Sequence, residues 1–227
     1  MKTLAVISQK GGVGKTTIAT ALAVAAEQDG KSVAIFDLDP QASACFWSDR
    51  RKTTGRSNTP VVRDVNYNRL TYYLEAMSRE GADLIILDCP PVHREIAEAA
   101  LNAANMILIP TRAEALDIRA MSQTVKLVHQ VGKVPTVVLT FCPPVGAEIE
   151  QAREIITTQL RAVVTPVDLH LRKAYPRAQQ DGLTAQEYEP GGKAALEIEK
   201  LYKYSSTILY GKEKPDEAKA KSRIRSR

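Results

Sequence analysis

The segment from Gln9 to Thr17 has residue types and a spacing that are suited to binding phosphate. It reads Gln-Lys-Gly-Gly-Val-Gly-Lys-Thr-Thr and lies between an apolar run and an alanine-rich run. Glycines let the backbone curl so that successive N–H groups point at phosphate oxygens, and a helix that begins near Lys15 adds the positive end of its dipole. A strand-loop-helix context of this kind predicts a nucleotide site rather than a glycine-rich turn without a ligand.

The polar residues of this loop have separate predicted roles. The Lys15 ammonium is expected to reach the β- and γ-phosphates, and the Thr16 hydroxyl to be a ligand of Mg²⁺. Thr17 is expected to contact the α-phosphate. Lys10 occupies a position where the common pattern has glycine. The predicted nucleotide-binding residues are Lys10, Gly11, Gly12, Val13, Gly14, Lys15, Thr16 and Thr17.

Carboxylates follow two other apolar runs. Asp37 and Asp39 stand at the end of the run 32–37, and Asp88 ends the run Leu84–Asp88. Ligands of open α/β sheets bind at the carboxyl ends of the strands, so all three carboxylates are expected beside the phosphate loop. We expect Asp88 to hold Mg²⁺ through a water molecule. An aspartate at the end of a strand can instead cap the next helix, and this alternative stays open for the first two.

The elements that must position these residues alternate along the chain. Continuous apolar runs predict buried strands at 3–8, 32–37, 84–88, 106–110 and 136–140. Amphipathic stretches predict helices at 15–28, 43–51, 67–79, 93–103, 115–130, 149–161 and 192–206, with a polar loop at 53–60. This order predicts an α/β fold: a single doubly wound, mostly parallel sheet with helices on both faces.

The composition indicates one large domain, residues 1–210, followed by a basic tail, residues 211–227. The chain has 227 residues, of which 44% are hydrophobic, and this is enough for one sizeable core. The tail holds seven Lys or Arg and three Asp or Glu, so it carries +4 of the net charge of +5. Its polar composition is typical of disorder, and it either contacts DNA or another anionic surface or is simply solvated.

Several classes of protein are disfavoured by the same composition. The three cysteines, Cys45, Cys89 and Cys142, form no CxxC pair, which disfavours a disulfide framework and a zinc or iron–sulfur site. No stretch approaches the roughly 20 apolar residues of a membrane span, and the residues before Gly11 do not resemble a signal peptide. Aromatic residues make up 5%, too few for a platform that stacks single-stranded nucleic acid. We therefore expect a reduced, cytoplasmic protein without a membrane partner.

Three motifs in order resemble those of the ParA/MinD family of ATPases. The segment 10–17 is similar to the deviant Walker A box of that family, the segment 37–41 (Asp-Leu-Asp-Pro-Gln) to its DxDPQ motif, and the segment 88–91 (Asp-Cys-Pro-Pro) to its DxPP motif. Segments 106–117, 172–182 and 187–201 are similar to small plasmid-type ParA proteins. The resemblance implies a P-loop ATPase fold, without the N-terminal helix-turn-helix module of larger ParA proteins.

The resemblance also implies roles for particular residues. It implies that Lys10 crosses a dimer interface to contact the partner's nucleotide, although a surface lysine is the alternative. It implies that Asp39 lies nearest the attacking water and Asp37 near Mg²⁺. The expected catalytic residues are Lys10, Lys15 and Asp39, the expected metal-binding residues are Thr16, Asp37 and Asp88, and the expected cofactors are ATP and Mg²⁺. An asparagine reads adenine in many relatives, whereas this chain offers Thr140 or backbone groups there.

By this resemblance the chain is a weakly active ATP hydrolase for plasmid or chromosome partition, cytoplasmic and associated with the nucleoid. Mg-ATP would close a sandwich homodimer that binds double-stranded DNA without sequence preference, and a ParB-type DNA-binding adaptor would stimulate hydrolysis. The expected contacts with DNA phosphates are Arg172, Lys173, Arg177 and Lys193. Similar ATPases position a relaxosome, a chemoreceptor array or a carboxysome, and this is the alternative. The chain end lacks the apolar helix face that a membrane-binding relative would need.

Overall fold

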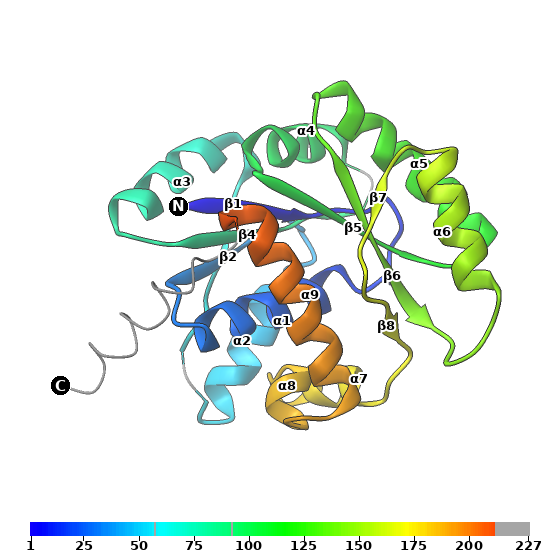
Figure 1. Cartoon of the computed structure of the whole chain (residues 1–227). Coiled ribbons are helices and arrows are strands. Elements are labelled where there is room, and N and C mark those ends of the chain that lie inside the picture. The colour runs from blue at the N-terminus through cyan, green and yellow to red at the C-terminus, as the bar shows by residue number, and fades with distance from the viewer. Residues whose placement is uncertain (57, 92, 212–227) are drawn as a thin grey trace.

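A computed structural model describes residues 1–56, 58–91 and 93–211, which form an eight-stranded sheet with helices on both faces (Figure 1). The strand order is β3-β2-β4-β1-β5-β6-β7, and β8 also pairs with β6. All of these pairings are parallel. The prediction of a single doubly wound, mostly parallel α/β sheet is confirmed. Of the predicted tail, 211–227, residues 212–227 lie outside the described residues.

All five predicted strands are present, and three others were missed. The strands are β1 (Lys2–Val6), β2 (Val33–Asp37), β3 (Val61–Asp64), β4 (Leu84–Asp88), β5 (Met106–Arg112), β6 (Pro135–Cys142), β7 (Val163–Val164) and β8 (Leu169–His170). β3 is an edge strand in which three of the four residues are exposed and one is partly buried, so it has no continuous apolar run. β7 and β8 have two residues each, too few for a periodic signal.

The helices follow the predicted order, with two additions between β8 and the last helix. They are α1 (Lys15–Gln28), α2 (Ser43–Thr53), α3 (Leu70–Arg79) after the 3-10 turn η1 (Tyr67–Arg69), α4 (Arg94–Ala103), α5 (Ala115–Gln130), α6 (Glu148–Thr158), α7 (Ala174–Gln180), α8 (Ala185–Tyr188) and α9 (Lys193–Tyr210). The short α7 and α8 were missed, and α9 continues to Tyr210, past the predicted end at 206. None of the helices in the described part of the chain combines the length and apolar character that crossing a lipid bilayer requires.

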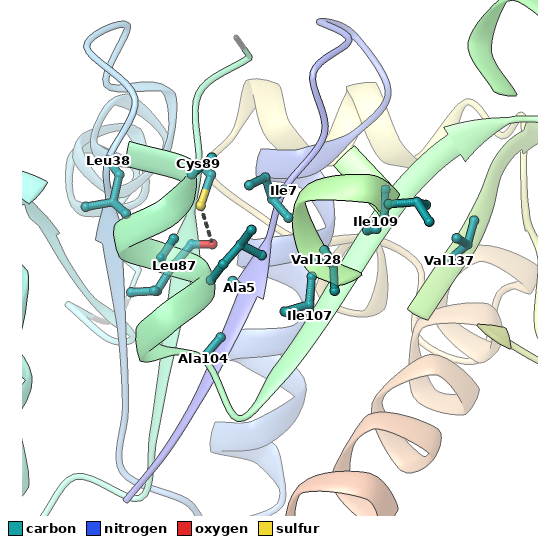
Figure 2. Packing of buried hydrophobic residues seen from close by; sticks show 14 of the residues in the cluster. Ala5, Ile7, Leu38, Leu87, Cys89, Ala104, Ile107, Ile109, Val128 and Val137 are labelled. Carbon is teal, nitrogen blue, oxygen red and sulfur yellow. Dashed lines mark hydrogen bonds between the residues drawn. The ribbon is translucent and has the colours of Figure 1, made fainter. Parts of the chain in front are cut away.

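Alternating strand residues build two separate core layers. Ala5 and Ile7 of the first strand segment belong to the layer that packs under α4 and α5, which Figure 2 shows with Leu87, Ile107 and Val128. The intervening residues of the same strand pack on the opposite face against the alanine-rich α1, which α9 covers in turn (Figure 1). Because both faces of the sheet are covered, the central strands are mostly apolar, as their continuous runs indicated.

The parallel arrangement brings the predicted chemistry to one edge of the sheet. Val6 and Asp37 are both in register with Asp88, since β4 lies between β1 and β2. The loops that follow these three strands therefore leave the sheet side by side, at their carboxyl ends. The phosphate loop and the two acidic segments become neighbours through this register alone.

The turn after α7 packs closely against α2. Gly182 has φ of +65°, and a Cβ atom there would lie 2.3 Å from the backbone nitrogen of Arg51. The Arg51 guanidinium donates to the Gly182 carbonyl oxygen at 3.1 Å and to both carboxylate oxygens of Glu187, at 3.0 and 2.7 Å. Trp47 donates to the Leu183 carbonyl oxygen at 3.1 Å. The segment 174–188 is thus fixed against the helix that follows the DxDPQ motif.

We expect Gly182→Ala to destabilise the protein more than Gly191→Ala. Both glycines have positive φ, which costs roughly 1–2 kcal/mol for alanine, but a Cβ at Gly191 meets nothing within 4 Å. The clash with α2 should add about 1–3 kcal/mol at Gly182 only. Urea unfolding of the two variants measures the difference, and an equal loss in both would show that the close approach to Arg51 is not a constraint.

Candidate nucleotide-binding site

The phosphate loop forms an open cradle at the start of α1. Gly12 and Gly14 have φ of +71° and +91°, a region that glycine adopts without strain. A Cβ atom at Gly11 or Gly12 would meet nothing within 4 Å, so the space above the loop is free, whereas the Val13 side chain is buried and anchors the loop. The residue that precedes α1 is Gly14, which has no side chain to cap the start of the helix. The N–H groups of this turn are therefore available to an anion.

The Lys15 side chain is buried inside the loop that it follows. Its ammonium donates to the carbonyl oxygen of Lys10 at 3.1 Å. Burial lowers the pKa of Lys15, and the nearby Asp88 and Asp39 carboxylates partly oppose this shift. A phosphate group in the cradle would supply the counter-charge that this ammonium is positioned to meet.

Thr16 and Asp88 fit a hydrated Mg²⁺. The Thr16 hydroxyl donates to Asp88 Oδ2 at 2.7 Å. Burial raises the pKa of Asp88 to about 7, and the hydrogen bond from Thr16 opposes the rise. Within the residues that the structure describes, Asp88 Oδ1 is buried without a hydrogen-bond partner, a costly state that a water ligand of a metal ion would relieve. One carboxylate and one hydroxyl suit Mg²⁺, which keeps most of its other positions for water and phosphate.

Asp37 and Asp39 have different surroundings although they are two residues apart. Asp37 is fully buried and accepts the N–H groups of Asp39, Ala44 and Cys45, at 3.1, 2.8 and 3.1 Å. Burial raises the pKa of Asp37, and these hydrogen bonds oppose the rise. The side chain therefore caps the start of α2, as the alternative interpretation held, and its contact with Mg²⁺ stays a prediction. Asp39 is half-buried, with Oδ1 accepting the Gln41 N–H at 2.9 Å.

Two adjoining cavities lie above the loop. The larger, about 630 Å³, is lined by the glycine loop with Lys15, Thr16 and Asp39. The smaller, about 220 Å³, is lined mostly by apolar side chains, among them Leu169, Tyr175 and Pro176. The cavities share four lining residues: Gly14, Thr17, Phe141 and Gln179. A hollow at the phosphate loop that adjoins an apolar one suits a triphosphate next to a flat base.

Phe141 stands between the two cavities in a strained conformation. Its φ is +54°, which is a clear outlier for a bulky side chain, and the residue is 40% exposed. Strain of this kind concentrates at functional sites. The Thr140 hydroxyl, by contrast, donates to the Thr111 carbonyl oxygen at 3.2 Å, so it is already used within the sheet. Thr140 and Phe141 both line the smaller cavity, and the Phe141 backbone angle is a feature that no sequence pattern could reveal.

A buried carboxylate on α9 holds the other wall of the smaller cavity. The Glu197 carboxylate accepts hydrogen bonds from the Arg172 guanidinium at 2.6 and 2.8 Å, from the His170 ring at 2.9 Å and from the Tyr175 hydroxyl at 3.0 Å. Burial raises the pKa of Tyr175, and the Glu197 charge adds to the shift. Gln179, one helical turn further on, donates to the Thr17 hydroxyl at 2.8 Å. Sequence reasoning missed Glu197, because its partners are 22 to 27 residues away along the chain.

The structure brings the four predicted DNA-contact residues together. They line one hollow of about 380 Å³, which also includes Tyr188 and the start of α9: Arg172, Lys173, Arg177 and Lys193. No side chain caps the first turn of α9. Arg172 is already paired with Glu197, so the other three cations are the more available ones. Contact with DNA stays a prediction for all four.

Lys10 is paired within its own chain. Its ammonium forms an ion pair with the carboxylate of Asp117, in the first turn of α5. The Lys10 side chain is 39% exposed, whereas that of Asp117 is fully buried. A contact between Lys10 and a partner's nucleotide stays a prediction, and it would require this ion pair to open.

Comparison with known proteins decides the family. Residues 4–185 match the CobQ/CobB/MinD/ParA nucleotide binding domain. The chain belongs to this family. The predicted resemblance to ParA and MinD is confirmed, and the CobQ/CobB/MinD/ParA domain covers the phosphate loop, both acidic segments and both cavities.

Individual relatives cover nearly the whole chain. The "Maintenance of carboxysome distribution protein A" of Gloeobacter kilaueensis is 32% identical over 206 residues, 89% of this chain and 91% of that protein. The "Sporulation initiation inhibitor protein Soj" of Bacillus subtilis is 27% identical over 224 residues, 76% of this chain and 87% of that protein. The MinD cell division protein of Aquifex aeolicus has the same fold, with a TM-score of 0.74 at 18% identity, over 95% of this chain and 99% of that one.

We expect Glu197→Gln to weaken both folding and nucleotide binding. An amide cannot replace the charge that Arg172 meets, so unfolding should become easier by about 2 kcal/mol or more. The cavity wall should lose its fixed position, and nucleotide affinity should fall several-fold. Glu199→Gln, on an exposed position of the same helix, is the control. Calorimetry with an ATP analogue and urea unfolding measure the two effects, and unchanged nucleotide affinity would separate Glu197 from the base cavity.

Proposed function

We propose that this chain is an ATP hydrolase of the partition type, whose Mg-ATP form is a homodimer that binds double-stranded DNA. The observation that carries the proposal is the phosphate loop with Lys10 ahead of Lys15, beside Asp39 and the Thr16–Asp88 pair. The proposed cargo is a plasmid or chromosome, attached through a ParB-type DNA-binding adaptor that stimulates hydrolysis. The proposed location is the nucleoid in the cytoplasm.

The chemistry follows from the positions of the side chains. Phosphates would lie in the cradle against the N–H groups of α1, with Lys15 on the β- and γ-phosphates. Thr16 would ligate Mg²⁺ and Asp88 would hold it through water, and the metal ion would supply neutralisation of phosphate charge. Asp39, on the rim of the larger cavity, would orient the attacking water. Lys10 of a second copy would add positive charge where the transition state needs it.

The base would enter the smaller cavity. Phe141, Pro176 and Tyr175 offer apolar surface to a flat ring, and none of them distinguishes one base from another by a charged contact. Gln179 joins this cavity to the α-phosphate region, because it donates to the Thr17 hydroxyl. The proposed preference for ATP therefore rests on family membership.

DNA binding is proposed for the hollow lined by Arg172, Lys173, Arg177 and Lys193, which we call the basic hollow. Each cation that meets a phosphate releases counterions, so binding should weaken steeply with salt. α7 contributes to both cavities: Arg177 lines the hollow, while Pro176 and Gln179 line the smaller cavity, and Arg172 lines both. A shift of α7 on nucleotide binding would therefore change the basic surface, which supports coupling between ATP and DNA.

A second candidate function is the positioning of a protein-shelled cargo. The observation in its favour is the 32% identity, over 89% of this chain, to a protein named for carboxysome distribution. The ATPase cycle would be the same, and only the adaptor would differ. A neighbouring gene for a small basic DNA-binding protein favours partition, whereas neighbouring shell-protein genes favour positioning.

We expect DNA binding to depend on ATP and on Lys10. In a filter assay, Mg-ATP should increase affinity for nonspecific duplex DNA at least about ten-fold over Mg-ADP, because two basic hollows act together in the dimer. Lys10→Ala should abolish the difference, while Lys200→Ala, on an exposed position of α9, should preserve it. Binding that is equal with both nucleotides and survives Lys10→Ala contradicts the proposal.

We expect Asp39→Ala to bind ATP but to hydrolyse it slowly. Loss of the group that orients water typically costs 10²–10⁴-fold in rate. The variant should therefore remain on DNA in its ATP form for longer than the parental protein. Asp49→Ala, on the exposed side of α2, is the matched control. Phosphate release under single-turnover conditions measures the rate, and a parental rate in Asp39→Ala would remove Asp39 from the water site.

A further inference from the structure

Two cations flank one buried carboxylate beside the phosphate loop. Asp117 Oδ1 contacts the Lys10 ammonium, and Asp117 Oδ2 lies 3.9 Å from Nε of Arg112. The Asp117 side chain is fully buried, while those of Lys10 and Arg112 are 39% and 35% exposed. Glu114, the other acidic group near Arg112, is 64% exposed and 3.9 Å away. Asp117 is therefore the charge in this group that most depends on a partner.

One oxygen of this carboxylate, Oδ2, forms no hydrogen bond with the described residues. In the part of the chain that the structure describes, Asp117 Oδ2 and Arg112 Nε are both buried and both without a hydrogen-bond partner. The two atoms face each other at a distance about 1 Å too long for a charge-assisted hydrogen bond. A buried donor and a buried acceptor that stay unpaired next to each other are costly and therefore uncommon.

Arg112 is held in place by weak contacts that a small movement can break. Its guanidinium donates to the Gly12 carbonyl oxygen at 3.4 Å and lies 4.8 Å from the centre of the Phe141 ring. Neither contact uses Nε. The planar guanidinium can keep its place on the aromatic ring while Nε moves toward a carboxylate, since stacking tolerates sliding.

We propose that Asp117 exchanges one cation for the other during dimer formation. Asp117 holds Lys10 while a protomer is alone, and it holds Arg112 once Lys10 has left for the nucleotide of a second copy. This inference rests on the proposed function, from which it takes the transfer of Lys10. Without a substitute cation, the departure of Lys10 would leave a buried carboxylate uncompensated, which strongly disfavours the step. Arg112 is thus a positioning residue that acts through Asp117.

Two features of the position suit this exchange. Asp117 is in the first turn of α5, where the helix dipole favours the charged carboxylate, so the group keeps its need for a cation. Arginine stays protonated, and it has five donors, so Nε can bond Asp117 while another nitrogen keeps Gly12. Glutamine at 112 would keep a donor but would lose the charge, which separates the two contributions experimentally.

The test is the dimer dissociation constant at saturating nonhydrolysable ATP analogue and Mg²⁺, measured by analytical ultracentrifugation. Arg112→Gln should raise it at least about ten-fold, since each of two protomers loses the replacement cation. Arg112→Lys should recover part of the loss. Arg112→Gln combined with Asp117→Asn should return to near the parental value, because an amide needs no cation. Arg119→Gln, an exposed arginine on α5, controls for net charge.

The outcomes separate this inference from the proposed function. If Arg112→Gln dimerises like the parental protein while Lys10→Ala does not, the exchange is refuted and the proposed function stands. If Arg112→Gln weakens the dimer and Asp117→Asn gives no rescue, Arg112 acts through Gly12 or Phe141 and the exchange is again refuted. If the parental protein forms no dimer with the analogue, both proposals fail together.

Discussion

Burial of the sheet on both faces is the constraint on which the rest of the structure depends. A strand covered on two sides disfavours charged side chains along its length, so the carboxylates of the candidate site are found at the strand ends. In a parallel sheet these ends meet at a single edge. The phosphate loop, Asp39 and Asp88 are neighbours for this reason, although more than 70 residues separate Thr16 from Asp88. Among the described residues, the two buried carboxylate oxygens without a hydrogen-bond partner, on Asp88 and Asp117, both occur at this edge, where a ligand or a moving cation can reach them.

The segment between β8 and α9 connects the separate parts of the candidate site. Glu197 fixes the start of this segment through Arg172, and the close approach of Gly182 to α2 fixes the turn after α7. Between these anchors, α7 has the base cavity on one side and the basic hollow on the other. The smaller cavity and the proposed DNA surface therefore share one helix of seven residues.

The sequence was sufficient for the elements that repeat a pattern and for motifs that are contiguous. The central strands, α1 and the phosphate loop could be predicted, because burial on both faces produces apolar runs and the loop is read from adjacent residues. β3, β7, α7 and α8 could not be predicted, since each is short and is stabilised by distant partners. The same holds for Phe141, Glu197 and Asp117: their importance lies in a backbone angle or in contacts across the fold. For Asp37, the sequence left two roles open, a place near Mg²⁺ and capping of the next helix. Only the hydrogen bonds to the start of α2 identified the capping role.

The burial of α1 has a mechanical consequence. Ten of its fourteen residues are buried, because the helix is enclosed between the sheet and α9. Its small alanine side chains let the helix lie close to the strands, where the neighbouring side chains are tightly packed. The phosphate end of a nucleotide bound in the proposed site would thus rest on a closely packed helix. Any displacement that follows a change in the γ-phosphate has to appear in the more exposed segments around it, which are the start of α2, the Lys10 side chain and α7.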